Sequence, residues 1–302
     1  MGIVTGTIEA TLLYPAPPRL AGVSLLDAVN AGLQPFGLWF WDVPAAPGEA
    51  LALSNGAMRV ALRPVEHPLP GAEIAAALGG SYTRLRPNDY AGRVAAHKAA
   101  VRLDVCDVRD ARPEPIPEAT MVVVAHAVVA AAKSAQPPLV IHWRQSDMLV
   151  LPEEVPPLRG IGFPASLVTR PEIVDAGRDS GGRLRLGVTA ALSERYFGKT
   201  VTVEPTAHPL DEVLSLIDFC LLKRLAGEEL LTDGATLGLP GPVEVTVRHR
   251  AASADHPAGS IALSLRAAPP RANLRRTPAP AVIEGSRARP SGAFAAPRTG
   301  AP

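Results

Sequence analysis

The chain has 302 residues, of which 47% are hydrophobic and 4% aromatic, and its formal net charge is +1. This composition is that of a globular protein with one large or two ordinary domains, and the near-zero charge excludes a global field that would attract nucleic acid or an anionic membrane. The N-terminal residues show no secretory signal, and Gly6 stands where a lipidation signal needs Ser or Thr. Neither Cys106 nor Cys220 belongs to a CxxC pair or a cluster with histidines, which favours buried thiols in a reducing compartment. We therefore expect a cytoplasmic protein.

Strand and helix signals alternate at the beginning of the chain. Strands are predicted over Ile3–Leu13, Leu38–Val43 and Met58–Leu62. A helix over Ser24–Gly32 separates the first two strands, because Ser24 is a suitable N-cap and Asp27 follows three residues later. The order of elements is therefore strand, helix, strand, strand.

The same order returns in the middle of the chain, around a long apolar segment. The run Ala119–Ala132 is shorter than the roughly 20 residues that cross a bilayer, and it contains His126. Glu118 at its start and Lys133 at its end match the charges that stabilise helix ends. We therefore interpret Glu118–Ser134 as a buried helix of a water-soluble domain.

Strands flank this helix on both sides. Over Ala99–Cys106 every second residue is apolar, which is typical of a strand with one buried face. After the helix, Leu139–Trp143 and Met148–Leu151 surround the polar turn Gln145-Ser146-Asp147 and predict a hairpin.

The last third of the folded region gives the clearest signals. Strands are predicted over Leu184–Val188, Thr200–Glu204, Val243–Arg250 and Ser260–Arg266. A helix is predicted over Pro209–Ala226, because Pro209 suits the first helical position and Gly227 suits the residue after the last. Cys220 lies on the apolar face of this helix, which favours a structural role for its thiol.

These elements predict an α+β fold of largely antiparallel sheets, with helices packed on one face. The recurring order of strand, helix, strand, strand also allows repeated β-α-β-β units in two lobes. The Pro-, Gly- and Arg-rich stretch Pro152–Gly182 is the expected seam between an N-terminal lobe, residues 1–160, and a C-terminal lobe, residues 161–267. Beyond it, Ala268–Pro302 has too few large aliphatic residues to form a core, and we expect a disordered tail.

No local motif identifies a catalytic or metal site. None of the histidines belongs to a metal-ligand spacing such as HxxxH, so no metal and no cofactor is predicted. For His126 and His249, on apolar faces, we favour core histidines with satisfied hydrogen bonds. The alternative is an enzyme, for example a hydrolase, whose site assembles from distant residues. Its candidate catalytic residues are His97, His142, Asp233 and His249, with His142 or His249 as general base.

Two other features resemble ligand sites. Asp233-Gly234 lies in a glycine-containing loop, but a strand rather than a helix N-terminus follows, and Asp-Gly is typical of a tight turn. Arg248, Arg250 and Arg266 are expected on the polar faces of neighbouring strands, where the interspersed Glu244 favours an ordinary solvated surface over an anion site.

A resemblance covers roughly residues 90–267. The passage Pro209–Arg250 runs from a helix through a turn into a strand. The turn contains Asp233, Gly234, Thr236 and Gly238. Upstream, His97-Lys98-Ala99 precedes an alternating strand, and the helix Glu118–Ser134 precedes a strand with Trp143. In these features the chain resembles the bacterial DUF4261 proteins, a family of unknown function, and the resemblance implies no catalytic residue or cofactor.

The sequence thus predicts a non-enzymatic cytoplasmic binding or accessory protein with a protein partner of unknown identity. The tail carries six arginines and one acidic residue. This basic composition suggests a third hypothesis beside the binding protein and the enzyme, namely an anion- or nucleic-acid-binding module. We favour the interpretation that the tail is an untethered extension without a ligand. If the chain does bind nucleic acid, we expect the tail to be the part that binds it. No membrane contact is expected.

Overall fold

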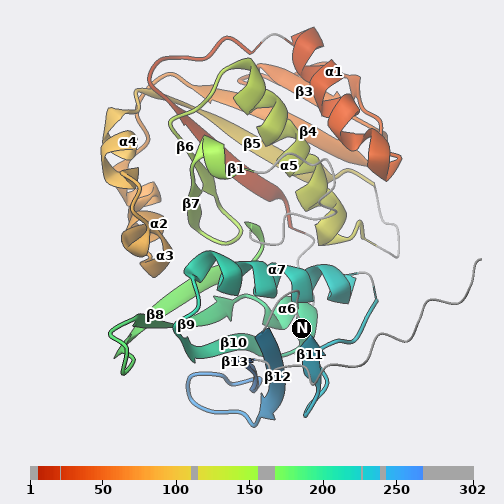
Figure 1. Ribbon diagram of the computed structural model, residues 1–302. Coiled ribbons are helices and arrows are strands. Elements are labelled where there is room, and N and C mark those ends of the chain that lie inside the picture. Colours follow the sequence, from red (N-terminus) through yellow and green to blue (C-terminus); the bar gives the residue numbers. More distant parts are fainter. Residues whose placement is uncertain are drawn as a thin grey trace, which may run out of the picture. The chain divides into compact units, whose positions relative to one another are not determined.

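The computed structural model describes residues 6–20, 22–109, 115–155, 167–225, 227–238 and 243–267. Its strands form two sheets, one of seven and one of six strands, against which helices pack (Figure 1). The fold is therefore α+β with mostly antiparallel sheets, which confirms the predicted class. The predicted disordered tail, Ala268–Pro302, lies outside the described residues.

The seven-stranded sheet takes its strands from the first half of the chain, and all its neighbouring strands are antiparallel. In spatial order they are β2 (Trp41–Asp42), β3 (Leu51–Ser54), β4 (Met58–Val65), β5 (Ala99–Asp107), β1 (Ile8–Tyr14), β6 (Val140–Trp143) and β7 (Met148–Val150). The central pairing sets Leu12 opposite Val101 on β5 and Ile141 on β6. Because side chains alternate along a strand, this register sends one set of apolar residues to each face.

Helices cover both faces of this sheet. The helices α1 (Gly22–Leu33) and α5 (Glu118–Ala135) pack on the face that carries Leu12 and Leu103. The short helices α2 (Ala75–Gly79) and α4 (Tyr90–Ala96) pack on the opposite face, where Leu13 and Ala100 join their core. The sequence predicted the long helices and their layer, whereas the second layer was not anticipated.

The six-stranded sheet follows in the second half of the chain. Its spatial order is β11 (Thr236–Gly238), β12 (Val243–Arg250), β13 (Ser260–Ala267), β10 (Thr200–Thr206), β9 (Leu184–Ala191) and β8 (Arg170–Arg178). All pairs are antiparallel except β10 with β13. The helix α7 (Leu210–Leu225) lies along one face and buries Val213, Ile217 and Cys220 against the strands (Figure 1).

Several predicted boundaries were wrong. The expected strand Leu38–Val43 is shorter in the structure, where β2 covers only Trp41–Asp42 at the edge of the sheet. One more backbone hydrogen bond, from the Val43 amide to the Ala52 carbonyl, follows before Pro44. The expected seam Pro152–Gly182 contains the whole of β8, an edge strand whose side chains are mostly exposed. Strand β3 and the helices α2, α3 (Ser81–Leu85) and α4 were not predicted.

The division between the sheets falls between Val150, at the end of β7, and Arg170, at the start of β8. Backbone contacts nevertheless gather Met1–Ala267 into one unit. The short helix α3 contributes to this, since it contacts both β7 and β8 and the Ser81 hydroxyl accepts a hydrogen bond from the Ile173 amide at 2.7 Å.

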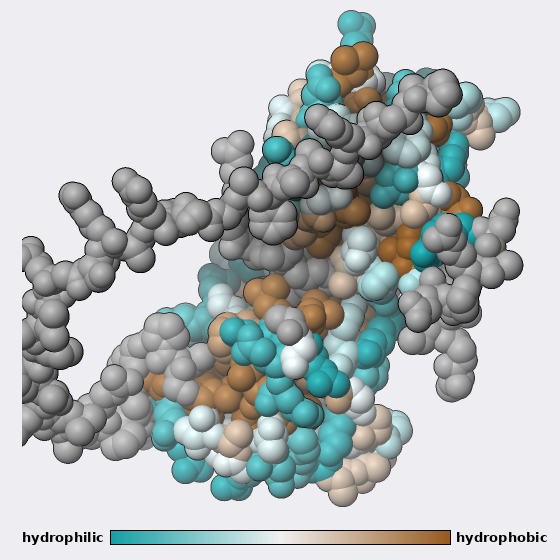
Figure 2. All heavy atoms as spheres, turned by 90° about the vertical axis from the view of Figure 1, so that its right-hand side faces the viewer, coloured by the Kyte–Doolittle hydropathy of each residue, from teal (hydrophilic) through white to brown (hydrophobic). Residues whose placement is uncertain are grey.

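Within the described residues, α5 is long and apolar enough to cross a membrane by length and composition alone. Most of its side chains are buried against the seven-stranded sheet and α1, as in the core helix of a folded domain. Elsewhere, large apolar side chains such as Trp39 and Trp41 stay exposed. Figure 2 shows one face of the molecule, on which hydrophobic residues lie among hydrophilic ones.

Candidate functional site

The four residues predicted as catalytic candidates lie in separate surroundings. His97 follows α4 and is buried. Its Nε2 accepts a hydrogen bond from the Leu69 amide at 2.9 Å, and its Nδ1 donates to the Val94 carbonyl. Both ring nitrogens are therefore engaged with backbone groups, which is what a neutral imidazole with a structural role does.

His142, on β6, forms a pair with Asp147 from the following turn. Its Nε2 donates to Asp147 Oδ1 at 2.8 Å, and the histidine is buried. Burial lowers the pKa of His142, although the Asp147 carboxylate opposes this effect. Asp147 has a φ of 50°, a left-handed conformation that Asp tolerates better than most residues. The predicted hairpin thus places the two side chains together.

Asp233 and His249 also meet, but through the backbone of the histidine. Asp233 Oδ1 accepts the His249 amide hydrogen at 2.7 Å, while the ring Nε2 donates to the Leu231 carbonyl at 2.6 Å. Gly234 follows with a φ of 78°, as the predicted tight turn requires. Both residues therefore tie the turn to β12.

The four candidates form two groups rather than one site. His97 and His142 belong to the seven-stranded sheet and its helices, and Asp233 and His249 to the six-stranded sheet. Among the described residues, no hydrogen bond or ion pair joins the first two to the last two. The geometry that would support a four-residue catalytic site is not present there.

His126 differs from the core histidine that the sequence favoured. It is buried in α5, and neither ring nitrogen has a hydrogen-bond partner among the described residues. Burial, with a smaller effect of Lys133, lowers its pKa to about 4. His249 does have its hydrogen bonds, so the expectation of a satisfied histidine is confirmed for that residue alone.

The cysteines are not equally buried. Cys220 is buried on α7, and this burial raises its pKa to about 12. Cys106, on β5, is only half-buried, although burial also raises the pKa of its thiol. Neither environment favours the reactive thiolate.

The predicted arginine stripe is a solvated face. Arg250 forms an ion pair with Glu204 on β10, and Ser264 donates to the same carboxylate. Glu244 stands opposite Arg266 in the pairing of β12 with β13. Opposite charges thus alternate across these strands, as the sequence suggested.

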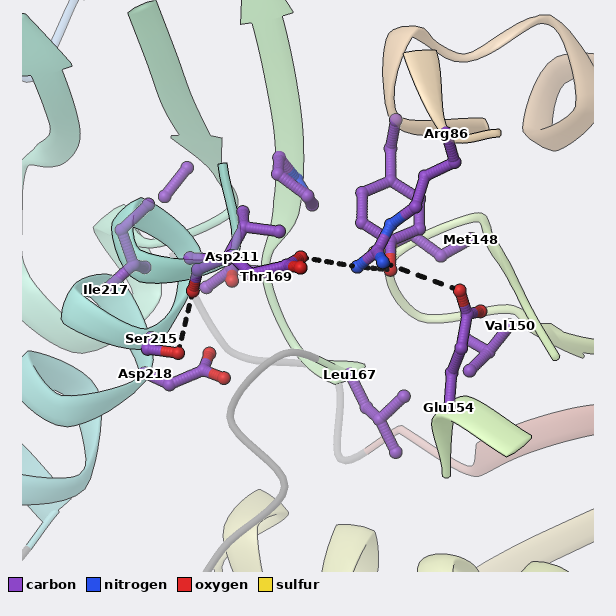
Figure 3. Close-up of a pocket in the computed structure, with 14 residues that line it drawn as sticks. Arg86, Met148, Val150, Glu154, Leu167, Thr169, Asp211, Ser215, Ile217 and Asp218 are labelled. Atoms are coloured by element: carbon purple, nitrogen blue, oxygen red, sulfur yellow. Dashed lines mark hydrogen bonds and ion pairs between the residues drawn. The ribbon is translucent and has the colours of Figure 1, made fainter. Parts of the chain in front are cut away.

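A cavity of about 240 Å³ lies between α3, β7 and α7 (Figure 3). Apolar and polar residues line it in equal numbers. The apolar ones are Met148, Val150, Leu167, Pro171, Ala190, Leu214 and Ile217. The polar ones are Tyr82, Arg86, Glu154, Thr169, Asp211, Ser215 and Asp218. We call this space the Arg86 cavity.

Arg86 is the only cation among the described residues of this wall, and it is held by three partners. Its guanidinium donates to the Tyr82 hydroxyl at 2.9 Å and lies 3.6 Å from Glu154 and 3.4 Å from Asp211 (Figure 3). Glu154 is fixed independently by the Tyr90 hydroxyl at 2.7 Å. The guanidinium thus joins α3 to α7 across the cavity.

Asp218 is the unusual group in the wall. It is half-buried on α7, one turn after Leu214, and burial raises its pKa to about 7. No hydrogen bond or ion pair links its carboxylate to another described residue. A carboxyl group whose pKa is raised by desolvation and that lines a cavity is a candidate for a functional role.

The sequence contained a partial signal for Asp218. It interrupts the apolar face of the predicted helix, between Leu214 and Leu221, where an apolar residue would be expected. The rest of the cavity had no such signal, because its wall combines segments around residues 82–86, 148–154, 167–171 and 211–218.

Among the described residues, no three His, Cys, Asp or Glu side chains are grouped so as to hold a metal ion. Comparison with known proteins finds no matching family model, no matching curated protein and no matching solved structure. The resemblance to the DUF4261 proteins therefore stays a prediction.

Proposed function

We propose that the chain is a non-enzymatic binding protein that takes up a small organic molecule in the Arg86 cavity. The observation that carries this proposal is the cavity wall, which combines apolar side chains with polar groups, among which Tyr82, Arg86 and Glu154 hold one another in place. Small-molecule sites have this composition, with volumes from about 300 Å³ upward. At about 240 Å³, the Arg86 cavity lies somewhat below that range, so it suits a ligand that is smaller than a drug-sized molecule.

The surroundings of the predicted catalytic residues also favour binding over catalysis. His97 and His249 use ring nitrogens to hold backbone groups, and His142 is held by Asp147. A general base must instead reach the proton that it removes from a substrate. The Arg86 cavity lies apart from these three histidines, since none of them contributes to its wall.

A specific observation favours an enzyme as the second candidate. Asp218 has a pKa of about 7, the value that suits a general acid or base at neutral pH. In that case Asp218→Asn would abolish turnover of a substrate while leaving its binding in place. A binding protein would turn over no substrate, either as the wild type or as Asp218→Asn, whatever the effect of the substitution on its affinity for the ligand.

The test is a ligand screen by thermal shift and native mass spectrometry with a variant that fills the cavity. Ser215→Phe is suitable, because Ser215 is an exposed residue of α7 that lines the cavity, and within the described residues its side chain bonds only to the Asp211 carbonyl, at 2.7 Å. The matched control is Ser134→Phe. Ser134 is an exposed serine on α5 with the same bond to the carbonyl four residues earlier, at 2.9 Å, and it does not line the cavity.

We expect small molecules that stabilise the wild type and the Ser134→Phe variant but not the Ser215→Phe variant. Ligands that bind all three proteins equally would place binding elsewhere and refute the proposal. A screen without any ligand would refute it as well.

A further inference from the structure

The charges of the described residues that line the Arg86 cavity do not balance. Among the described residues of its wall, Glu154, Asp211 and Asp218 are acidic, and Arg86 alone is basic. Arg86 is already shared between Glu154 and Asp211. The wall residues from β7, β8 and β9 are uncharged, so none of them compensates Asp218.

We propose that the Arg86 cavity binds a small organic cation, an alkyl- or arylalkylammonium, whose ammonium group pairs with Asp218 while its hydrocarbon part contacts Met148 and Ile217. This inference rests on the proposed function and specifies its ligand. Figure 3 shows Asp218 on the α7 side of the cavity, apart from the cluster of Arg86 with Glu154.

A cation fits this arrangement better than an anion. An anionic ligand would have to take Arg86 from its present partners, and it would meet the carboxylates of Asp211 and Asp218. A neutral ligand would leave Asp218 desolvated without a partner, which is costly for the charged form. An ammonium group removes that cost, because a nearby opposite charge favours ionisation of a buried carboxyl.

The apolar wall sets the second requirement. Leu214 and Ile217 on α7 and Met148 and Val150 on β7 can cover a short hydrocarbon chain or one ring. Each methylene that the ligand buries there adds to the hydrophobic free energy of binding. A fully hydrated cation such as Na⁺ lacks this contribution, so an organic ammonium is preferred.

The pH dependence follows from the titration of Asp218. In the part of the chain that the structure describes, the charged groups that share the cavity with it are Arg86, Glu154 and Asp211. With a pKa of about 7, the carboxyl is roughly one-tenth ionised at pH 6 and nine-tenths ionised at pH 8. The affinity for an ammonium ligand should therefore rise about tenfold over this interval, because the amine stays protonated throughout.

The experiment uses three probes of similar shape: 2-phenylethylamine, 2-phenylethanol and 3-phenylpropanoate. Their affinities for the full chain are measured by calorimetry or ligand-observed NMR at pH 6 and pH 8. We expect the amine to bind at least about tenfold more tightly than the alcohol at pH 8, and the propanoate most weakly. At pH 6 the preference for the amine should largely disappear.

Two variants separate the inference from the proposed function. In Asp218→Asn, the amine should lose its preference, while the affinity for the alcohol changes less than about twofold. Ser215→Phe should remove binding of every probe, and Ser134→Phe should change none. The alcohol affinity and the thermal unfolding of Asp218→Asn show that this variant is folded.

Three results would overturn the inference: equal affinity for amine and alcohol at pH 8, an amine preference that survives in Asp218→Asn, or no binding of the amine. If other molecules in the screen still bind in a manner that Ser215→Phe abolishes, the proposed binding function stands and only the choice of a cation is wrong. If nothing binds in that manner, both fail.

Discussion

Arg86 both stacks on Tyr82 and donates a hydrogen bond to it. The guanidinium carbon lies 4.8 Å from the centre of the tyrosine ring, and Nη2 lies 2.9 Å from the hydroxyl oxygen. Tyr82 is buried, so its ring fixes the direction in which Arg86 leaves the end of α3. One side of the cavity is thereby preorganised, with the cation aimed at Glu154 and Asp211 before any ligand arrives.

The first prediction concerns the two ion pairs of Arg86. Glu154 is 15% exposed and Asp211 is 79% exposed, so solvent weakens the second pair far more than the first. We expect Arg86→Met to cost about 1–2 kcal/mol of unfolding free energy, because a largely buried carboxylate and hydroxyl lose a partner. Denaturant unfolding measures this cost.

Double-mutant cycles then separate the two partners. The coupling of Arg86→Met with Glu154→Gln should be about 1 kcal/mol, and with Asp211→Asn below about 0.5 kcal/mol. Equal coupling energies would show that Asp211 stabilises the guanidinium as much as Glu154 does, although the Asp211 side chain is far more exposed.

The second prediction is that Asp218 destabilises the folded chain as pH rises. Its pKa is about 7 in the folded state against an ordinary value of 3.8. Between these pH values the folded state therefore binds more protons than the unfolded state. The free energy of unfolding should therefore fall between pH 4 and pH 7. The full shift corresponds to about 4 kcal/mol, and partial access of water to the side chain reduces this to roughly 2 kcal/mol.

Asp218→Asn should remove this loss, and at pH 8 the variant should be more stable than the wild type. Chemical unfolding at several pH values measures both effects. A variant that is less stable than the wild type at pH 8 would mean that the carboxylate has a favourable partner in the folded chain.

The third prediction concerns His126, whose effect has the opposite sign. Its pKa is about 4 in the folded state against an ordinary 6.5, so the unfolded state binds more protons between these values. The free energy of unfolding should therefore rise from pH 4 to pH 6.5, by up to about 3 kcal/mol. In the wild type this rise is offset by Asp218 over the same interval, so the comparison is best made in the Asp218→Asn protein.

In that background, His126→Leu should abolish the rise. It should also raise stability at pH 7, because a buried imidazole without partners among the described residues is replaced by an apolar side chain of similar size. A pH slope that persists after this substitution would assign the acid sensitivity to other groups.

Local patterns in the sequence predicted the elements with a strong period. The alternation of Val245 and Val247 with polar residues predicted β12, whose bounds in the structure are the same, Val243–Arg250. Helix α7 begins and ends within one residue of the prediction, because its capping residues and apolar face agree. Because these signals are local in the sequence, they predict an element without knowledge of the fold.

The elements that were missed lack such a period. Only Pro171 and Ile173 of β8 are buried, since the strand lies at the sheet edge, and helices of five residues such as α2 are too short for a helical pattern. The cavity was missed for a different reason. Arg86, Glu154 and Asp211 are brought together by tertiary packing, and their charges have no meaning as a group until the chain folds.

The last prediction tests the role of Asp233, one of the residues that sequence reasoning proposed for catalysis. Its carboxylate accepts the amide hydrogen of His249 at 2.7 Å and so ties the turn to β12. Asp233→Ala removes the acceptor and should cost about 1 kcal/mol of unfolding free energy. Asp233→Asn keeps an acceptor oxygen in the same place and should cost less than half of that.

Ligand binding in the Arg86 cavity should be unchanged in both Asp233 variants, because Asp233 is not part of the cavity wall. If Asp233→Asn instead reduced an activity while stability stayed constant, the carboxylate would have a chemical role that a hydrogen bond to the backbone does not explain. That outcome would restore the enzyme interpretation and would place its site beside β12 rather than on α7.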